Sequence, residues 1–177
     1  MRKTKRNGIE KLIKTLNKNG YFESPGSTKY HCNYCGGLVE HCNNIYIMFK
    51  ELCKKFNLDV PEDTIIICSF LHDICKVGLY EKLGNGYVYN REHPKGHTLL
   101  SLRRILKFIE LTKEEEEIIK FHMGPYGSKE FLGMKGEYFL KEMTNCYSTN
   151  KIAKLFYFCD DMCSQFIEKT KNERKER

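Results

Sequence analysis

One segment of the chain, residues 62–76, limits the possible folds more than any other. If helical, it carries apolar side chains at every angle around its axis: Ile65, Ile66, Ile67, Cys68, Phe70, Leu71 and Ile74. A helix that is apolar on all sides is buried by its neighbours. The same segment contains His72 and Asp73, and burying an isolated ion costs several kcal/mol. The rest of the fold must therefore enclose this helix and supply partners for both side chains.

The remaining sequence also has a helical period, which predicts an all-α protein of about five to seven helices. The segments expected to be helical are about 8–19, 37–56, 94–111, 113–123 and 149–171. Thr112 and Glu115 have the spacing of a capping box at the start of the fourth of these. Residues 126–148 are the least regular part, with a short helix expected around 137–143. The turn Gly84-Asn85-Gly86 favours one small β-hairpin or an ordered loop.

Length and composition are those of an ordinary globular domain. The 177 residues, of which 41% are hydrophobic and 30% charged, predict a single domain over 1–177. No stretch approaches the ~20 apolar residues of a membrane span. The basic N-terminus is not followed by an apolar segment, so we expect a cytoplasmic protein without a membrane partner. The sequence leaves the oligomeric state open.

Nine cysteines raise the question of disulfides or a zinc site. Their number is odd and most lie within apolar helical patterns, which favours reduced, buried thiols. Cys32 and Cys35 have C-x-x-C spacing, with Cys42 nearby. A structural zinc site needs four ligands and normally two such pairs. A zinc knuckle is therefore the less favoured interpretation.

The net charge of +7 is concentrated at the N-terminus. Residues 1–20 hold seven lysines and arginines against one glutamate, a net charge of +6, on an expected basic helix. Such a segment can contact nucleic acid or attract an anionic substrate, and a solvated helix face explains it as well. The solvated face is the interpretation that we favour.

Helical wheels direct one histidine and one carboxylate toward the interior from the second and last helices. The stripe of the second helix consists of Leu38, Cys42, Ile45, Phe49, Leu52 and Phe56. The stripe of the last helix consists of Ile152, Leu155, Phe156, Cys159, Cys163, Phe166 and Ile167. His41 lies at the edge of the first stripe and Asp160 at the edge of the second, whereas Asp161 lies on the opposite side.

Two further histidines, His97 and His122, lie near apolar residues of their own helices. A single buried histidine is commonly satisfied by a backbone carbonyl. Here one small core would have to satisfy four imidazoles and two carboxylates, once His72 and Asp73 are included. The joint pattern therefore favours a shared ligand such as a metal ion.

The order and spacing of these residues resemble the HD superfamily of metal-dependent phosphohydrolases. The matching motifs are GGLVEH ending in His41, FLHDICK with His72 and Asp73, GHTLLSL with His97, FHMG with His122, and FYFCDD with Asp160. They cover about residues 30–165, the expected core of the domain. The nearest likeness is to a group of short HD hydrolases of bacteria and phages. The resemblance implies an HD-domain helical bundle that cleaves phosphoester or phosphoanhydride bonds.

Applied position by position, the resemblance assigns a role to each residue. The implied metal ligands are His41, His72, Asp73, His97, His122 and Asp160, with Asp73 able to bridge two ions. Asp73 and Lys76 are the implied catalytic residues, and Lys76 either orients Asp73 or contacts phosphate oxygens. His31 is a candidate substrate-binding residue at the mouth of the site. Position alone suggests that Tyr126 and Lys129 line the pocket.

The donor set itself indicates the kind of cofactor. Imidazole and carboxylate groups suit one or two divalent ions, Mn, Fe, Co, Ni, Zn or Mg, rather than a metal that prefers thiolates. Such an ion compensates the buried Asp73. It also lowers the pKa of a bound water from about 15.7 toward ~7, which gives a hydroxide able to attack phosphorus.

Two departures from the family pattern narrow the expected function. Cys75 stands where the cyclic-dinucleotide phosphodiesterase branch has glycine, and Lys76 stands where a 5′-deoxynucleotidase branch has an acidic residue. We expect hydrolysis of a small phosphorylated substrate, in the first place a nucleotide. The alternatives are a 3′–5′ exonuclease or phosphodiesterase acting on nucleic acid, and a catalytically silent HD module that binds a ligand.

Overall fold

The computed structural model describes residues 1–28, 31–84, 86–131 and 133–168. This part of the chain is mostly helical, with one two-stranded hairpin, in agreement with the predicted all-α class. The α-helices are α1 (Ile9–Lys18), α2 (Gly37–Lys55), α3 (Glu62–Leu71), α4 (His97–Ile105), α5 (Lys113–Phe121), α6 (Met134–Thr149) and α7 (Lys151–Met162). Short 3-10 helices cover Ile74–Lys76 and Gly124–Glu130, and a π-helical turn covers Cys163–Ile167.

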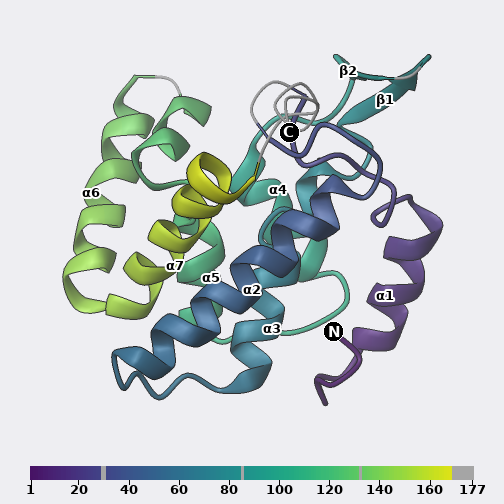
Figure 1. Cartoon of the computed structure of the whole chain (residues 1–177). Helices are drawn as coiled ribbons and strands as arrows, with labels where there is room; N and C mark the ends of the chain where they lie inside the picture. The colour runs from purple at the N-terminus through teal and green to yellow at the C-terminus, as the bar shows by residue number, and fades with distance from the viewer. Residues whose placement is uncertain (29–30, 85, 132, 169–177) are drawn as a thin grey trace.

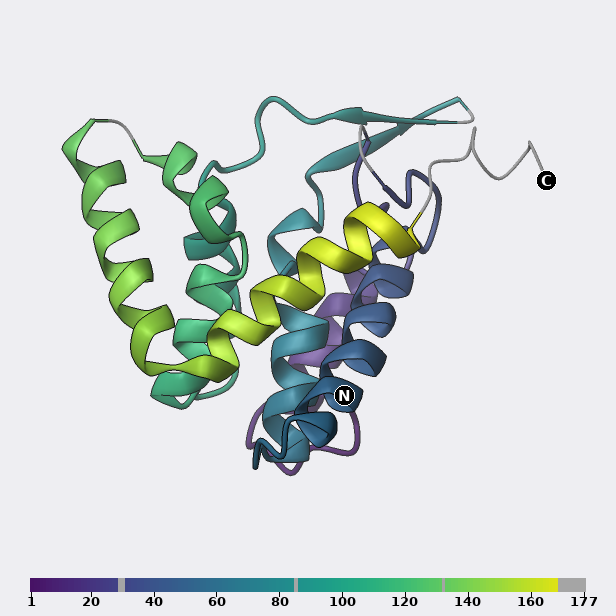
Figure 2. The same cartoon turned by 60° about the vertical axis from the view of Figure 1, so that its left-hand side comes forward.

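Helix α3 is enclosed by its neighbours, as its all-round apolar character predicts. Seven of its ten residues are buried, and it packs against α2 and α5. Helix α7 packs against α2, α5 and α6, and crosses between α6 and α2 in Figure 2. Helices α1 and α6 lie on opposite sides of this group (Figure 1). The buried apolar side chains form one cluster to which all of these helices contribute.

The predicted hairpin is present as strands β1 (Tyr80–Leu83) and β2 (Gly86–Tyr89). The strands are antiparallel, with Tyr80 opposite Tyr89 and Leu83 opposite Gly86. Asn85, the middle residue of the predicted turn, lies outside the described residues. The hairpin projects beyond one end of the helices (Figures 1 and 2), and its strands bury little side-chain surface.

The predicted bounds of three helices are wrong. Helix α3 does not continue to residue 76, because Asp73 leaves the helical conformation at φ −105° and ψ 17° and the chain continues as a 3-10 turn. Helix α4 begins three residues late, after Gly96 in the left-handed region at φ +99°, and ends at Ile105. Helix α6 is much longer than the short helix expected at 137–143.

The end of the last helix also differs from the prediction of a helix over 149–171. The regular helix stops at Met162, the π-helical turn follows, and Glu168 is extended at φ −94° and ψ 130°. Residues 169–171 lie outside the described part. A π-helical turn contains an extra residue, which rotates the following side chains away from the earlier stripe. Phe166 and Ile167, expected to be buried, are therefore 78% and 50% exposed. Phe56, just beyond the end of α2, is likewise exposed.

The N-terminal segment is tied to α5 through one buried carboxylate. Glu115 forms the predicted capping box with Thr112, which is confirmed on both sides. The same carboxylate accepts hydrogen bonds from the Arg6 guanidinium and from the Thr64 hydroxyl. Glu115 is fully buried, so these donors compensate its charge.

Along the described ranges we find no helix with the length and apolar character required to cross a bilayer.

Candidate metal centre

The structure brings together all six residues proposed as metal ligands. The six residues come from α2 (His41), the two positions directly after α3 (His72 and Asp73), the start of α4 (His97), the position after α5 (His122), and α7 (Asp160). His41 Nε2 lies 3.2 Å from Asp160 Oδ1 and 3.5 Å from Asp73 Oδ2. His122 Nε2 lies 3.5 Å from Asp73 Oδ1. Residues on or next to five helices thus bring nitrogen and oxygen donors into overlapping groups.

The Gly-Gly lead-in to α2 positions His41. Gly36 adopts the left-handed region at φ +83°, directly before the helix. A Cβ atom on Gly37 would lie 2.0 Å from the Cys32 carbonyl oxygen, so the loop passes too close for any other residue. These two glycines allow the loop to contact the first turn of α2, and His41 follows one turn later.

Hydrogen bonds fix the tautomers of His72 and His122. The Nδ1 atom of His72 lies 3.0 Å from the Ser69 carbonyl oxygen, and the Nδ1 atom of His122 lies 2.7 Å from that of Ile119. A carbonyl oxygen can only accept, so each Nδ1 carries the hydrogen. In the neutral ring the lone pair is then on Nε2, the atom that faces the centre.

Two of the converging histidines place a lone pair on Nε2 where a cation could accept it. His122 Nε2 is buried and has no hydrogen-bond partner among the described residues. His72 Nε2 faces His41 Nε2 at 3.3 Å. Two lone pairs at this distance repel unless a proton or a cation lies between the rings. The donors form overlapping groups: His41 with His72 and Asp160, and His72 with Asp73 and His122. These residues are compatible with a metal ion, and imidazole with carboxylate is a set that divalent ions accept.

The Asp73 carboxylate is held from both sides. Lys76 Nζ lies 2.5 Å from Oδ2, and His97 Nε2 lies 2.5 Å from Oδ1. Burial favours neutral forms of both Asp73 and Lys76, but their attraction outweighs it. The pKa of Asp73 is therefore held well below its usual range, with a further contribution from the neighbouring histidines, and the pKa of Lys76 is raised. This ion pair is the contact that one of the two roles proposed for Lys76, the orientation of Asp73, requires.

His41 and His72 differ in their proton affinity, although both are buried. Burial lowers the pKa of His72 to about 3, so this ring is neutral. Burial also opposes protonation of His41, but the carboxylates of Asp160, Asp73 and Glu168 outweigh it and hold the pKa of His41 well above its ordinary value. In the metal-free protein the carboxylates around His41 therefore favour its protonated form.

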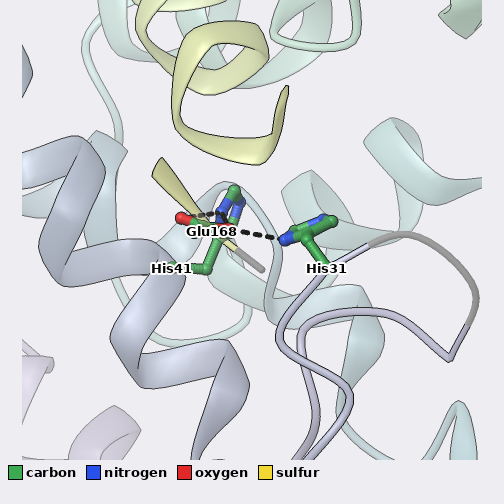
Figure 3. Close-up of side chains that lie close together, drawn as sticks. All are labelled: His31, His41 and Glu168. Atoms are coloured by element: carbon green, nitrogen blue, oxygen red, sulfur yellow. Dashed lines mark hydrogen bonds and ion pairs between the residues drawn. The ribbon is translucent and has the colours of Figure 1, made fainter. Parts of the chain in front are cut away.

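His31 lies behind His41 rather than at an exposed mouth of the site. It is buried, and its Nδ1 atom lies 2.5 Å from Glu168 Oε2 (Figure 3). The same carboxylate lies 2.9 Å from His41 Nδ1. Burial would raise the pKa of Glu168, but the two imidazoles outweigh it and hold that pKa well below the usual range. Glu168 was missed at the level of sequence because it follows an irregular turn.

His97 has a different partner for its second nitrogen. The Cys75 sulfur lies 3.3 Å from His97 Nδ1, and with Asp73 these residues form a further group of possible ligands. Burial opposes protonation of His97, but Cys75 and Asp73 outweigh it and raise its pKa. Cys32 and Cys35, considered for a zinc knuckle, belong to none of the ligand groups of the described residues.

A cavity of about 500 Å³ adjoins the centre on the side of His97. Its lining includes Cys75 and His97, the hairpin residue Tyr89, and the lysines Lys95 and Lys129. Lys129 was predicted to line the pocket from position alone, and its ammonium group lies over the ring of the exposed Tyr126. The cavity therefore joins possible metal ligands to an aromatic ring, two cations and one carboxylate, that of Glu130.

Comparisons of the chain with protein-family models, with curated proteins and with solved structures found no match.

Proposed function

We propose that the protein is a metal-dependent phosphohydrolase of the HD type, which cleaves a phosphoester or phosphoanhydride bond in a small phosphorylated substrate. The observation that carries the proposal is the convergence of Nε2 atoms on two carboxylates, with the tautomers of His72 and His122 fixed from behind. Outer hydrogen bonds of this kind orient histidines toward a metal. The buried Nε2 atom of His122 has no hydrogen-bond partner among the described residues, and a metal ion would accept its lone pair.

The balance of buried charge supports at least one divalent ion. Asp73, Asp160 and Glu168 are ionised, since their pKa values are lowered, and they contribute three negative charges. Lys76 supplies one positive charge beside Asp73, and His97, whose pKa is raised, supplies another when it is protonated. These two groups do not balance the three carboxylates, and a divalent ion supplies the missing positive charge.

The residues of the centre would hold the ion and the substrate in distinct ways. The ligands of the proposed ion are His41, His72, His122, Asp73 and Asp160. His97 contacts the ligand Asp73 through its Nε2 atom. When bound, a divalent ion supplies Lewis-acid chemistry, because it acidifies water toward neutral pH and polarises a phosphoryl oxygen. Lys76 keeps Asp73 ionised and adds positive charge where a phosphoryl group would develop negative charge.

The cavity beside His97 supports a small substrate in preference to a polymer. About 500 Å³ lies within the range of sites for small ligands. Lys95 and Lys129 suit a phosphate group, and Tyr89 offers a ring on which a nucleotide base can stack. None of the basic residues of the N-terminal segment lines this cavity. The cavity alone therefore favours a small phosphorylated substrate over a nucleic acid.

A matched pair of variants tests the proposal. The wild type is assayed against a panel of nucleotides and simple phosphoesters with each of Mn, Co, Ni, Zn and Mg, beside Asp160→Asn and Asp161→Asn. These neighbouring carboxylates differ in that only Asp160 contacts the centre. We expect metal-dependent turnover that Asp160→Asn lowers by at least about 100-fold and that Asp161→Asn leaves nearly unchanged.

Two results would contradict this function. A wild type that binds none of these metals would exclude the metal centre itself. A wild type that binds metal and nucleotide tightly but turns over no member of the panel would instead identify a ligand-binding module.

A further inference from the structure

The carboxylate of Glu168 lies between two imidazoles that come from different parts of the chain. His31 belongs to the loop before α2 and His41 to α2, whereas Glu168 directly follows the π-helical turn (Figure 3). The side chain of Glu168 is 0% exposed. A carboxylate without contact to water must be fully hydrogen-bonded, and nothing in the proposed reaction uses it.

Four contacts hold this carboxylate in one orientation. His31 Nδ1 lies 2.5 Å from Oε2. His41 Nδ1 lies 2.9 Å from Oε2 and 3.0 Å from Oε1. The Asn44 amide donates to Oε1 at 3.2 Å. The backbone is fixed as well, because the Glu168 amide donates to the Cys163 carbonyl at 2.9 Å. The carboxylate therefore cannot turn away from His41 without losing several bonds.

We propose that Glu168 is a positioning residue of the metal centre, which fixes the ring and the tautomer of His41 so that its Nε2 faces the ion. This role rests on the proposed metal site, whose geometry would then depend on a residue that follows the last regular helix. His72 and His122 direct Nδ1 to neutral carbonyls, but His41 directs it to a carboxylate. A carboxylate behind a histidine increases the basicity of the ligating nitrogen and is worth about 10–100-fold in metal affinity.

The other partners of Glu168 have a supporting role in this arrangement. His31 forms a separate group of possible ligands with His41 and Glu168, but neither His31 nor Asn44 belongs to the groups that contain His72. They occupy lone pairs of the carboxylate that His41 does not use, and so select its rotation. The role of His31 is thus to anchor Glu168, and Glu168 is hydrogen-bonded to the ligand His41. The centre is closed on this side by a segment that lies beyond the last regular helix.

The experiment compares metal affinity in Glu168→Gln with that in a matched control, Glu115→Gln. Glu115 is also fully buried and hydrogen-bonded, but to Arg6 and Thr64 at the start of α5. The dissociation constant of Co²⁺ is measured by calorimetry, and the visible absorption of bound Co²⁺ reports its coordination. We expect Glu168→Gln to weaken binding by about 10–100-fold and to alter the spectrum. Glu115→Gln should lower the melting temperature and leave both readouts unchanged.

Further variants keep the inference open to refutation. Glu168→Asp retains the charge and should recover part of the lost affinity. If Glu168→Gln does not fold, His31→Asn, which removes one anchor and leaves His41 intact, should still weaken binding. If the wild type binds Co²⁺ and the Glu168 and His31 variants bind it with the same affinity, the role of Glu168 is refuted while the proposed function stands. A wild type that binds no Co²⁺, Mn²⁺ or Zn²⁺ would overturn it together with the proposed function.

Discussion

Replacement of Asp73 by asparagine should destabilise the metal-free protein chiefly because it leaves Lys76 without its counter-ion. The two side chains are 3% and 10% exposed, so water replaces little of the lost interaction. In the folded protein Lys76 Nζ lies 2.5 Å from Asp73 Oδ2. Asparagine keeps the shape of the side chain, which confines the change to charge and hydrogen bonding.

The expected size of the effect follows from the separation and the burial. At 2.5 Å and an effective dielectric constant of about 20, the attraction between unit charges is about 7 kcal/mol. The desolvation of both groups offsets much of this, and removal of one partner of a buried pair costs about 3–5 kcal/mol. A domain is stable by only about 5–15 kcal/mol, so the variant would lose a large share of its stability.

A double-mutant cycle distinguishes this cause from simple damage to the core. Urea unfolding is followed by circular dichroism in EDTA for Asp73→Asn, Lys76→Met and the double variant. Because the double variant buries no unpaired charge at this position, it should regain most of the stability that Asp73→Asn loses. The exposed pair of Lys120 and Glu142 serves as the control cycle, with a coupling of at most about 1 kcal/mol. A double variant no more stable than Asp73→Asn would refute the reasoning.

Two further predictions concern protons and capping. Metal affinity should rise about tenfold per pH unit between pH 5 and 7, because His41 with its raised pKa must lose about one proton to bind, whereas His72 with a pKa of about 3 loses none. Calorimetry in two buffers of different ionisation enthalpy measures this proton, and an affinity independent of pH would contradict it. Thr112→Ala should remove the capping box of α5 and lower stability by about 1 kcal/mol, seen as a small decrease in melting temperature. Unchanged melting would show that the cap is redundant.

Helical periodicity was sufficient to find the residues that lie on regular helices. It separates Asp160 from its neighbour Asp161, because adjacent residues point about 100° apart and only one of them can border the buried stripe. It places His41 toward the interior for the same reason, and His41 is 1% exposed. The all-round apolar pattern of residues 62–76 predicted an enclosed helix, which the structure has as α3 and ends at Leu71. Regular geometry makes these positions readable from one sequence.

Residues beyond the ends of regular helices could not be placed in this way. Glu168 reaches His41 only because the chain passes through a π-helical turn and then becomes extended. A continued α-helix, as predicted to residue 171, gives no reason to connect Glu168 with the loop that carries His31. The contact between Cys75 and His97 likewise depends on the 3-10 turn after Asp73 and on the late start of α4. Such irregular turns have no clear periodic signal.

The end of α3 shows why these boundaries matter for the chemistry. In a continuous helix the Ser69 carbonyl would accept the amide of Asp73, four residues on. Because α3 stops at Leu71, this carbonyl is one of the unpaired groups of a helix C-terminus, and it accepts the Nδ1 hydrogen of His72. The end of α5 repeats the arrangement, with His122 directly after the helix and bonded to the carbonyl three residues earlier. Termination of the two helices thus supplies the acceptors that turn both Nε2 lone pairs toward the centre.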